Sequence, residues 1–217
     1  MDLERGTLFD LSHPLADGDE AYPGDPGVSY RTVHTCGEDG YHVTLIEMGS
    51  HVGTHIDAPR HIDDSGRTVE ALDLGKLVGP AMVVDVDLGS ADAITGSNIE
   101  LDFAQLAGGE RLLFRTGWGS QRGKPGFFTE FPDLDLALAT ALAGSGVSLV
   151  GLEQPSVHRT AHKEVHRVLL DAEIIVVEAL SGLERLRSRN VYLMCLPLPH
   201  VGLDGAAVRA VAWDPGE

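Results

Sequence analysis

The sequence predicts an α/β fold in which one mixed sheet is accompanied by a few helices. Two observations lead to this prediction: short apolar or β-branched runs recur along the chain, and helical patterns occur only between the later ones. The second half therefore alternates strand and helix, whereas the first half is strand and loop. With 217 residues, 43% of them hydrophobic, the chain can bury a sizeable core. We expect a single domain over residues 1–217.

Each predicted strand is short, rich in apolar or β-branched residues, and flanked by Gly, Pro, Asp or Asn. The predicted strands are 7–12, 42–48, 81–87, 111–116, 147–152, 173–179 and 191–196. The predicted helices are 97–109, 132–146 and 157–172. Ser97 would cap the first helix, and Leu134, Leu138 and Leu142 recur at i, i+4 spacing along one face of the second.

The charge balance narrows the classes of partner. The net charge is −17, from 16 Lys and Arg against 33 Asp and Glu, so we expect no basic face for nucleic acid or an anionic membrane. No signal peptide is visible at the start, and no stretch approaches the roughly 18 apolar residues of a membrane span. The two cysteines, Cys36 and Cys195, favour a reducing compartment, so we expect a cytoplasmic protein. A single bridge between them is the alternative.

Residues 49–61, GSHVGTHIDAPRH, crowd three histidines and an aspartate into thirteen positions. In an extended segment His51, His55 and Asp57 would point to one side, and in a helix His51 and His55 would stack one turn apart. Two imidazoles and a carboxylate suit zinc, with manganese or iron as alternatives, and leave a position for water. The alternative is a hydrogen-bonded surface cluster, which would be unusually free of Lys and Arg.

A second group of titratable residues lies at 153–178. His158, His162 and His166 are spaced i, i+4, i+8, so a helix would place them on one face. Glu178 lies in the apolar run IIVVEAL, where burying a carboxylate is costly unless it is paired or binds an ion. Two alternatives remain open: a solvated helix face for the histidines, and a solvent-facing glutamate on an edge strand.

The pattern H-x-G-T-H-x-D-x-P-x-H at 51–61 resembles the motif of the cyclase-like metal hydrolases, which include bacterial kynurenine formamidases and isatin hydrolases. Further blocks resemble the family in the same order: FDLSHPL near the start, YPGDP at 22–26, LLFRTGW at 112–118, and the segment from His166 to Leu180. The resemblance therefore covers nearly the whole chain. It implies the swivelling β/β/α fold and a homodimer or higher homo-oligomer.

The resemblance also implies roles for particular residues. His51, His55 and Asp57 correspond to metal ligands, and His61 corresponds to the histidine that donates and accepts protons. In members with two ions a later His and a Glu twelve residues beyond it complete the site, which selects His166 and Glu178. We therefore expect one or two divalent ions, with zinc favoured and manganese as the alternative.

Two departures from the formamidase pattern concern the substrate. Tyr22 stands where the formamidases carry Trp, at the wall against which the substrate ring lies. In LEQPSVH (152–158), Glu153 and His158 each stand in place of an aspartate. Both departures affect the expected substrate more than the metal site.

The expected function is hydrolysis of an amide or cyclic amide C–N bond in a small molecule, with an aryl formamide resembling N-formylkynurenine as the favoured substrate. Water activated by the metal would attack, and His61 would act as general base and acid. One alternative is a metal-dependent cyclase or dehydratase of a secondary-metabolite pathway. Another is a non-catalytic protein that binds metal or ligand.

Overall fold

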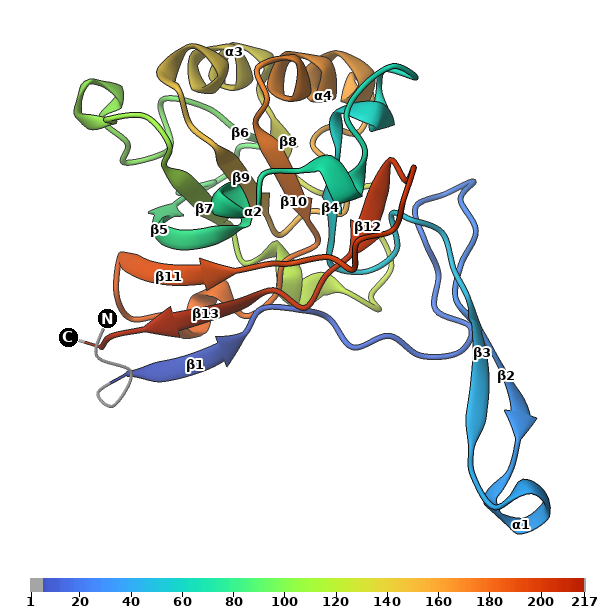
Figure 1. The fold of residues 1–217 in the computed structure, drawn as a ribbon. Coiled ribbons are helices and arrows are strands. Elements are labelled where there is room, and N and C mark those ends of the chain that lie inside the picture. The colour runs from blue at the N-terminus through green and yellow to red at the C-terminus, as the bar shows by residue number, and fades with distance from the viewer. Residues whose placement is uncertain (1–5, 217) are drawn as a thin grey trace.

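The computed structural model describes residues 6–216, and its centre is a curled mixed sheet (Figure 1). The strands of this sheet are β1 (Thr7–Asp10), β4 (His55–Asp57), β5 (Val78–Asp85), β7 (Arg111–Arg115), β9 (Leu149–Leu152), β10 (Ile175–Glu178), β11 (Asn190–Met194), β12 (Gly205–Ala207) and β13 (Val211–Asp214). They lie in the order β1-β13-β11-β5-β7-β9-β10-β4-β12. Strands β5, β7, β9 and β10 run parallel, and antiparallel strands flank them on both sides.

Two small sheets and several helices complete the fold. The small sheets pair β2 (Ser29–His34) with β3 (Val43–Glu47), and β6 (Ala93–Ile94) with β8 (Asp133–Leu134). The helices are α1 (Cys36–Asp39), α2 (Leu74–Leu77), α3 (Leu136–Ser145) and α4 (His162–Asp171). The 3-10 turns are η1 (Pro59–His61), η2 (Val69–Ala71), η3 (Phe103–Gln105), η4 (Trp118–Gln121) and η5 (Leu183–Arg185).

The predicted α/β class with one mixed sheet is confirmed, and each of the seven predicted strands overlaps an observed strand. Helices α3 and α4 lie inside predicted helices but begin later, so Leu134 belongs to β8. The helix predicted over 97–109 is wrong. Asp102 instead accepts a hydrogen bond from the Ala104 N–H and caps a single 3-10 turn, and left-handed Gly108 follows that turn.

Each face of the sheet carries its own core. Helices α3 and α4 pack together over one face, where the core includes Leu142, Leu169 and Val176 (Figure 1). The core on the other face includes Ile56 and Val177. Because successive side chains of a strand alternate between faces, the neighbours of Ile56 in β4 point toward α4.

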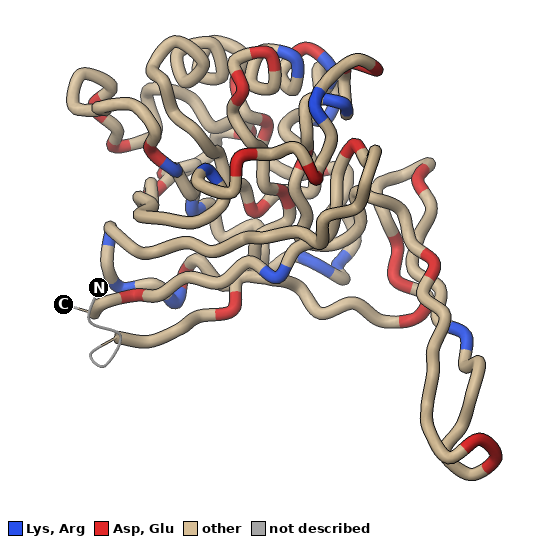
Figure 2. The backbone as a smooth tube through the Cα atoms, in the orientation of Figure 1, with Lys and Arg blue, Asp and Glu red and all other residues tan. Residues whose placement is uncertain are grey.

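Strands β2 and β3 form an arm that projects from the body, with α1 at its tip (Figure 1). Every residue of β3 is exposed, including Val43, Leu45 and Ile46. Most of the arm's length carries no charged residue, whereas acidic and basic positions are interspersed over the body (Figure 2). The arm therefore carries little charge along its length and exposes several apolar side chains.

The two cysteines lie in different environments. Cys36 begins α1 and is exposed, whereas Cys195 is buried in the core. Both are free, so the alternative of a bridge between them is wrong. Within residues 6–216, no helix combines the length and the apolar character needed to cross a membrane.

Candidate metal centre

Strands β4 and β10 place three titratable side chains on one face of the sheet. The strands pair antiparallel, with Glu178 opposite His55 and Val176 opposite Asp57. Residues two apart in a strand share a face, and so do directly opposed residues, so His55, Asp57 and Glu178 all point toward α4. Strand β10 lies between β9 and β4, and Glu178 is only 3% exposed. The alternative of a solvent-facing glutamate on an edge strand is therefore wrong.

Helix α4 supplies His166 from above this face. His166 is 3% exposed and its Nδ1 donates to the His162 carbonyl oxygen, which is the one atom that His162 contributes here. His158 lies before the helix, where its Nδ1 accepts the backbone N–H groups of Thr160 and Ala161. The predicted helical stripe of three histidines is therefore wrong at His158, because the helix begins only at His162.

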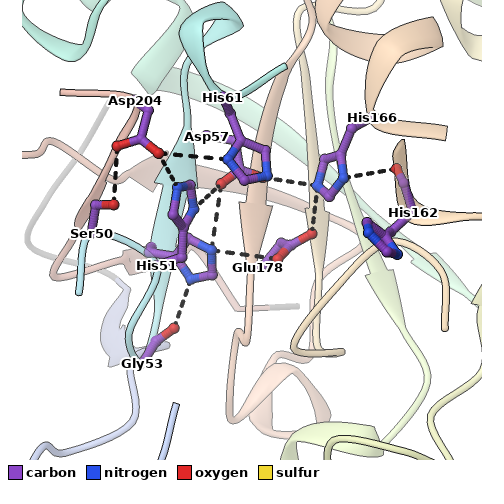
Figure 3. Close-up of polar contacts among 10 residues, drawn as sticks. Ser50, His51, Gly53, Asp57, His61, His162, His166, Glu178 and Asp204 are labelled. Atoms are coloured by element: carbon purple, nitrogen blue, oxygen red, sulfur yellow. Dashed lines mark hydrogen bonds and ion pairs between the residues drawn. The ribbon is translucent and has the colours of Figure 1, made fainter. Parts of the chain in front are cut away.

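The side chains form a tight cluster (Figure 3). His166 Nε2 lies 3.1 Å from Glu178 Oε1 and 3.2 Å from Asp57 Oδ2. His55 Nε2 lies 3.4 Å from Asp57 Oδ1 and 3.4 Å from Glu178 Oε2. His51 Nδ1 lies 2.8 Å from Asp57 Oδ1. Among the described residues, three triads have potential ligand atoms within 4.8 Å of one another. Two of them, His51–His55–Asp57 and Asp57–His166–Glu178, share Asp57, and the third, His51–His61–Asp204, is less buried.

The hydrogen bonds of the imidazoles indicate that this cluster can bind a cation. His55 Nδ1 donates to the Gly53 carbonyl oxygen and His166 Nδ1 to that of His162, both at 2.9 Å. In a neutral ring the other nitrogen, Nε2, then carries a lone pair, and both Nε2 atoms face carboxylate oxygens. That arrangement is unfavourable unless a proton or a metal ion lies between them. His55 Nε2 and Asp57 Oδ2 are moreover buried without a hydrogen-bond partner, so the donor set fits a divalent ion.

The pKa values of these residues also show that the carboxylates of the cluster stabilise positive charge on the imidazoles. Burial lowers the pKa of His55 and His166, but contacts with Asp57 and Glu178 outweigh burial and raise both to about 10. Burial also lowers the pKa of His51, and its hydrogen bonds raise it to about 9. Burial raises the pKa of Asp57, yet the imidazoles hold that pKa well below its usual value. A divalent ion must displace these protons, so acid should weaken its binding.

His61 lies over the cluster on the side that solvent can reach. It ends turn η1, directly after β4, and its ring centroid lies 4.1 Å from that of His51 and 5.0 Å from that of His166. Burial lowers the pKa of His61, which favours the neutral imidazole. His61 is therefore close enough to the cluster to exchange a proton with a molecule bound there.

Asp204 is a site residue that the sequence analysis missed. Its Oδ2 lies 2.9 Å from His51 Nε2 and 3.7 Å from His61 Nδ1, and its Oδ1 accepts the Ser50 hydroxyl at 3.0 Å. Its backbone carbonyl accepts the Ala58 N–H, which fixes the segment before β12 against the end of β4. The sequence offers only an Asp-Gly pair at this position, which is a common turn pattern.

A narrow cleft adjoins the cluster. His51 and His55 of the cluster line this cleft. Two loops supply its aromatic wall: Tyr22 comes from the loop before β2, and Phe127 and Phe128 come from the loop after η4. The Phe128 ring stands edge-on to Tyr22, with 6.4 Å between centroids, and to Phe127, with 4.9 Å between centroids. Tyr22 thus lies at the same cleft as the histidines.

Glu153 is buried beneath the second of these loops. Its Oε2 accepts the N–H groups of Thr116 and Gly117 and the Thr116 hydroxyl. Burial raises its pKa, and these hydrogen bonds oppose that effect. Glu153 therefore holds the turn between β7 and η4, which leads into this loop, and takes no part in the cluster.

The chain resembles known proteins over almost its full length. Kynurenine formamidases from Bacillus cereus and Salinibacter ruber are 37% identical over 213 residues and 36% identical over 217 residues, each covering 96% of this chain and 98% of the relative. A solved structure described as a potential metal-dependent hydrolase with cyclase activity is 28% identical, covers 96% of this chain and 98% of its own, and superposes with a TM-score of 0.79.

An isatin hydrolase bound to the product analogue thioisatinate shares the fold, with a TM-score of 0.82 at 19% identity over 97% of this chain and 93% of its own. The Cyclase family model, described as "Putative cyclase", matches residues 9–159, which is more than half of the chain. The match includes the motif at 51–61 and the loops of the cleft. The chain therefore belongs to the Cyclase family.

Proposed function

We propose that the protein is a metal-dependent hydrolase that cleaves the C–N bond of an aryl formamide or a closely related amide. The observation that carries this proposal is the convergence of two Nε2 lone pairs with the carboxylates of Asp57 and Glu178 beside a cleft with aromatic walls. The kynurenine formamidases at 36–37% identity support this reaction and favour hydrolysis over the cyclase or dehydratase alternative.

We assign two sites that share Asp57. His51, His55 and Asp57 would hold one ion, and Asp57, His166 and Glu178 would hold a second. Imidazole and carboxylate donors favour zinc, with manganese as the alternative. When bound, such an ion would polarise the formyl carbonyl and lower the pKa of a water molecule from about 15.7 toward 7.

His61 would move the proton between water and the leaving amine. Its Nδ1 faces Asp204, which leaves Nε2 as the atom that takes the proton from water. The same nitrogen then returns the proton to the departing nitrogen, because an arylamine leaves more readily once it is protonated. Water adds to the formyl carbon, the C–N bond breaks, and formate and the arylamine result.

The cleft supports an aromatic substrate of the N-formylkynurenine type. Tyr22, Phe127 and Phe128 can flank a planar ring in offset or edge-on contact. Tyrosine offers a smaller face than the tryptophan of the formamidase pattern and adds a hydroxyl group. We therefore propose a small aryl formamide as the substrate.

The test combines metal analysis with one substitution. Protein purified without chelators should contain one or two divalent ions per chain. His61→Ala should keep its ions and lose at least about a hundredfold in kcat, the scale of a general base. His200→Ala removes an exposed histidine outside the cluster and should change neither quantity. Metal-free wild-type protein, or full activity of His61→Ala, would contradict the proposal.

We also propose that the protein works as a homodimer in which the arm of each copy packs on the other. An isolated two-stranded hairpin is only marginally stable in water, yet this arm exposes Val33, Val43 and Ile46 by more than 40% each. A second apolar set, Leu198 and Val201, is exposed on the loop before β12. In a two-fold dimer, each copy can cover such surfaces on its partner.

Light scattering during size exclusion tests the dimer. The wild-type protein should have twice the chain mass of 23.1 kDa. Ile46→Asp, on the arm, should shift the protein toward the monomer. Leu8→Asp makes the same apolar-to-acidic change at a 56% exposed position of β1 and should leave the dimer intact. A monomeric wild-type protein would contradict this proposal.

A further inference from the structure

Arg122 is the one Arg or Lys side chain among the described residues that line the cleft. It follows η4 directly, on the loop that carries Phe127 and Phe128. Its side chain is only 17% exposed, although the protein as a whole is strongly acidic. Removing most of a guanidinium from water is costly unless acceptors compensate, so the position of Arg122 calls for a partner.

The guanidinium of Arg122 has one hydrogen-bond acceptor, which occupies only one of its nitrogen atoms. Asp19 Oδ2 lies 3.2 Å from Arg122 Nη2. A guanidinium has five N–H donors in a planar fork, and the described residues provide its side chain with no other hydrogen bond. The unused donors can bind a planar acceptor such as a carboxylate through two parallel hydrogen bonds.

The surroundings of Arg122 favour an anion that is attached to an aromatic ring. The same narrow cleft is lined by His51 and His55 of the cluster and by the rings of Tyr22 and Phe128. A small molecule bound at this cleft would therefore lie beside the cluster, the rings and Arg122. Glu20 also lines the cleft, but it is an exposed residue at the surface.

The positive charge of Arg122 also acts on His13, a neighbour of the cleft. Burial, reinforced by the positive charge of Arg122, lowers the pKa of His13 to about 4. His13 stands edge-on to Phe127, with 6.2 Å between ring centroids, so the group that Arg122 influences lies directly against an aromatic residue of the cleft.

We propose that Arg122 is a specificity-determining residue that binds a carboxylate carried by the aromatic substrate, so that the enzyme prefers anionic aryl amides. This inference rests on the proposed function and names the substrate class of the same site. The competing explanation is structural: the Arg122–Asp19 pair would only tie the two loops together. The two explanations differ in whether the effect of Arg122 depends on the charge of the substrate.

A matched pair of substrates separates them. 2-Formamidobenzoate and its methyl ester have the same ring and the same ortho substitution, but only the first carries a charge. Arg122→Gln should lower kcat/KM for the acid by about tenfold to a hundredfold, the scale of hydrogen bonds to a charged group. For the ester the change should stay within about threefold. Arg122→Lys should lie between these values for the acid, because it keeps the charge and loses the fork.

Arg187→Gln is the control for net charge, because Arg187 is exposed and its side chain makes no hydrogen bond or ion pair among the described residues. It should leave both substrates unaffected. Equal losses for the acid and the ester in Arg122→Gln would support the structural explanation and overturn the proposal. An unchanged kcat/KM for the acid would overturn it as well.

Calorimetry on metal-free protein separates this inference from the proposed function. Without an ion, the carboxylate of 2-formamidobenzoate cannot bind metal, so a charge preference must come from the protein. The acid should bind the wild-type protein about tenfold or more tightly than it binds Arg122→Gln, and the ester should bind both alike. A wild-type enzyme that hydrolyses neither compound would refute the proposed function, yet the binding comparison would still decide the role of Arg122.

Discussion

The cluster and the wall of the cleft are built in different ways. Most of the cluster lies on paired strands or on α4, and the Nδ1 atoms of His55 and His166 are fixed by backbone carbonyl oxygens. The wall comes from two loops, and Tyr22 and Phe128 contact each other mainly through ring edges. The sheet thus determines one region and the loops determine the other.

This difference separates chemistry from substrate choice. A shift of one residue in the pairing of β4 with β10 would turn His55, Asp57 or Glu178 to the other face, so the sheet tolerates little change at the cluster. Loops can change length and sequence without disturbing a sheet. We therefore expect substitutions in the cluster to abolish metal binding, and substitutions in the wall to change substrate preference while metal stays bound.

Two buried glutamates give the largest contrast. Glu178→Gln removes a charge from the cluster, whereas Glu153→Gln removes one that only backbone N–H groups and a hydroxyl satisfy. Glu178→Gln should lose at least one ion per chain, and its kcat should fall further than the roughly hundredfold expected for loss of a general base. Glu153→Gln should retain its ions. Metal analysis and kcat measured on the same preparations check both outcomes.

The distinction between the cluster and the wall would be contradicted if Glu178→Gln and Glu153→Gln lost the same amount of metal. Equal metal loss would mean that any buried glutamate near this sheet supports the cluster through folding alone. Thermal denaturation of both metal-free proteins excludes that explanation when their transitions are equally cooperative.

Asp204 should give the next largest effect, because it contacts the cluster from the loop before β12 and not from the paired strands. It contacts His51 and lies near His61 but does not touch Glu178 or His166. A carboxylate that fixes the second nitrogen of a metal-binding imidazole is typically worth about tenfold to a hundredfold in metal affinity or activity. Asp204→Asn should therefore weaken metal binding by that factor, as measured by competition with a chelator. Unchanged affinity and activity would show that Asp204 only joins β12 to β4.

The contrast also explains what could be predicted from the sequence. The spacing of His51, His55 and Asp57 lies within one segment, and Glu178 was conspicuous as a carboxylate in an apolar strand, so local patterns identified them. The residues alone left three histidines of 158–166 open, and only the resemblance selected His166. His158 could not be judged because i, i+4 spacing does not tell where a helix begins.

Asp204 could not be found in this way, because its place depends on the pairing of β12 with β4. Strands β4 and β12 have three residues each, too few for an alternating pattern to be recognised. The helix predicted at 97–109 failed for a related reason. Ile99, Phe103 and Leu106 are apolar at a spacing that suits a helix, but they pack on the core from an irregular segment around η3.

In the wall, Tyr22→Ala should weaken substrate binding and leave the ions in place. An aromatic contact of this kind is worth about 0.5–1.5 kcal/mol beyond the area buried, so KM for an aryl formamide should rise by at least about two- to tenfold. Tyr22→Phe keeps the ring and should stay close to the wild type. A loss of metal in Tyr22→Ala would contradict the separation between wall and cluster.

The smallest expected effect concerns His13, which packs against Phe127 of the wall. Its pKa is shifted in the opposite direction from that of His55 in the cluster. Burial, helped by Arg122, lowers the pKa of His13 to about 4, whereas carboxylates raise the pKa of His55 to about 10. The unfolded chain takes up a proton at His13 below about pH 6.5, and the folded protein does so only near 4. In this window the unfolded state binds more protons, so the contribution of His13 to stability falls as the pH falls.

His13→Gln removes this contribution and leaves the cluster unchanged. Allowing for the partial exposure of His13, the free energy of unfolding of metal-free wild-type protein should fall by about 1 kcal/mol more than that of the variant between pH 7 and pH 5. Urea denaturation at the two pH values measures the difference, and the cluster imidazoles cancel because both proteins contain them. An equal pH dependence would mean that His13 takes up its proton as readily in the folded protein as in the unfolded chain, which would contradict its burial against Phe127.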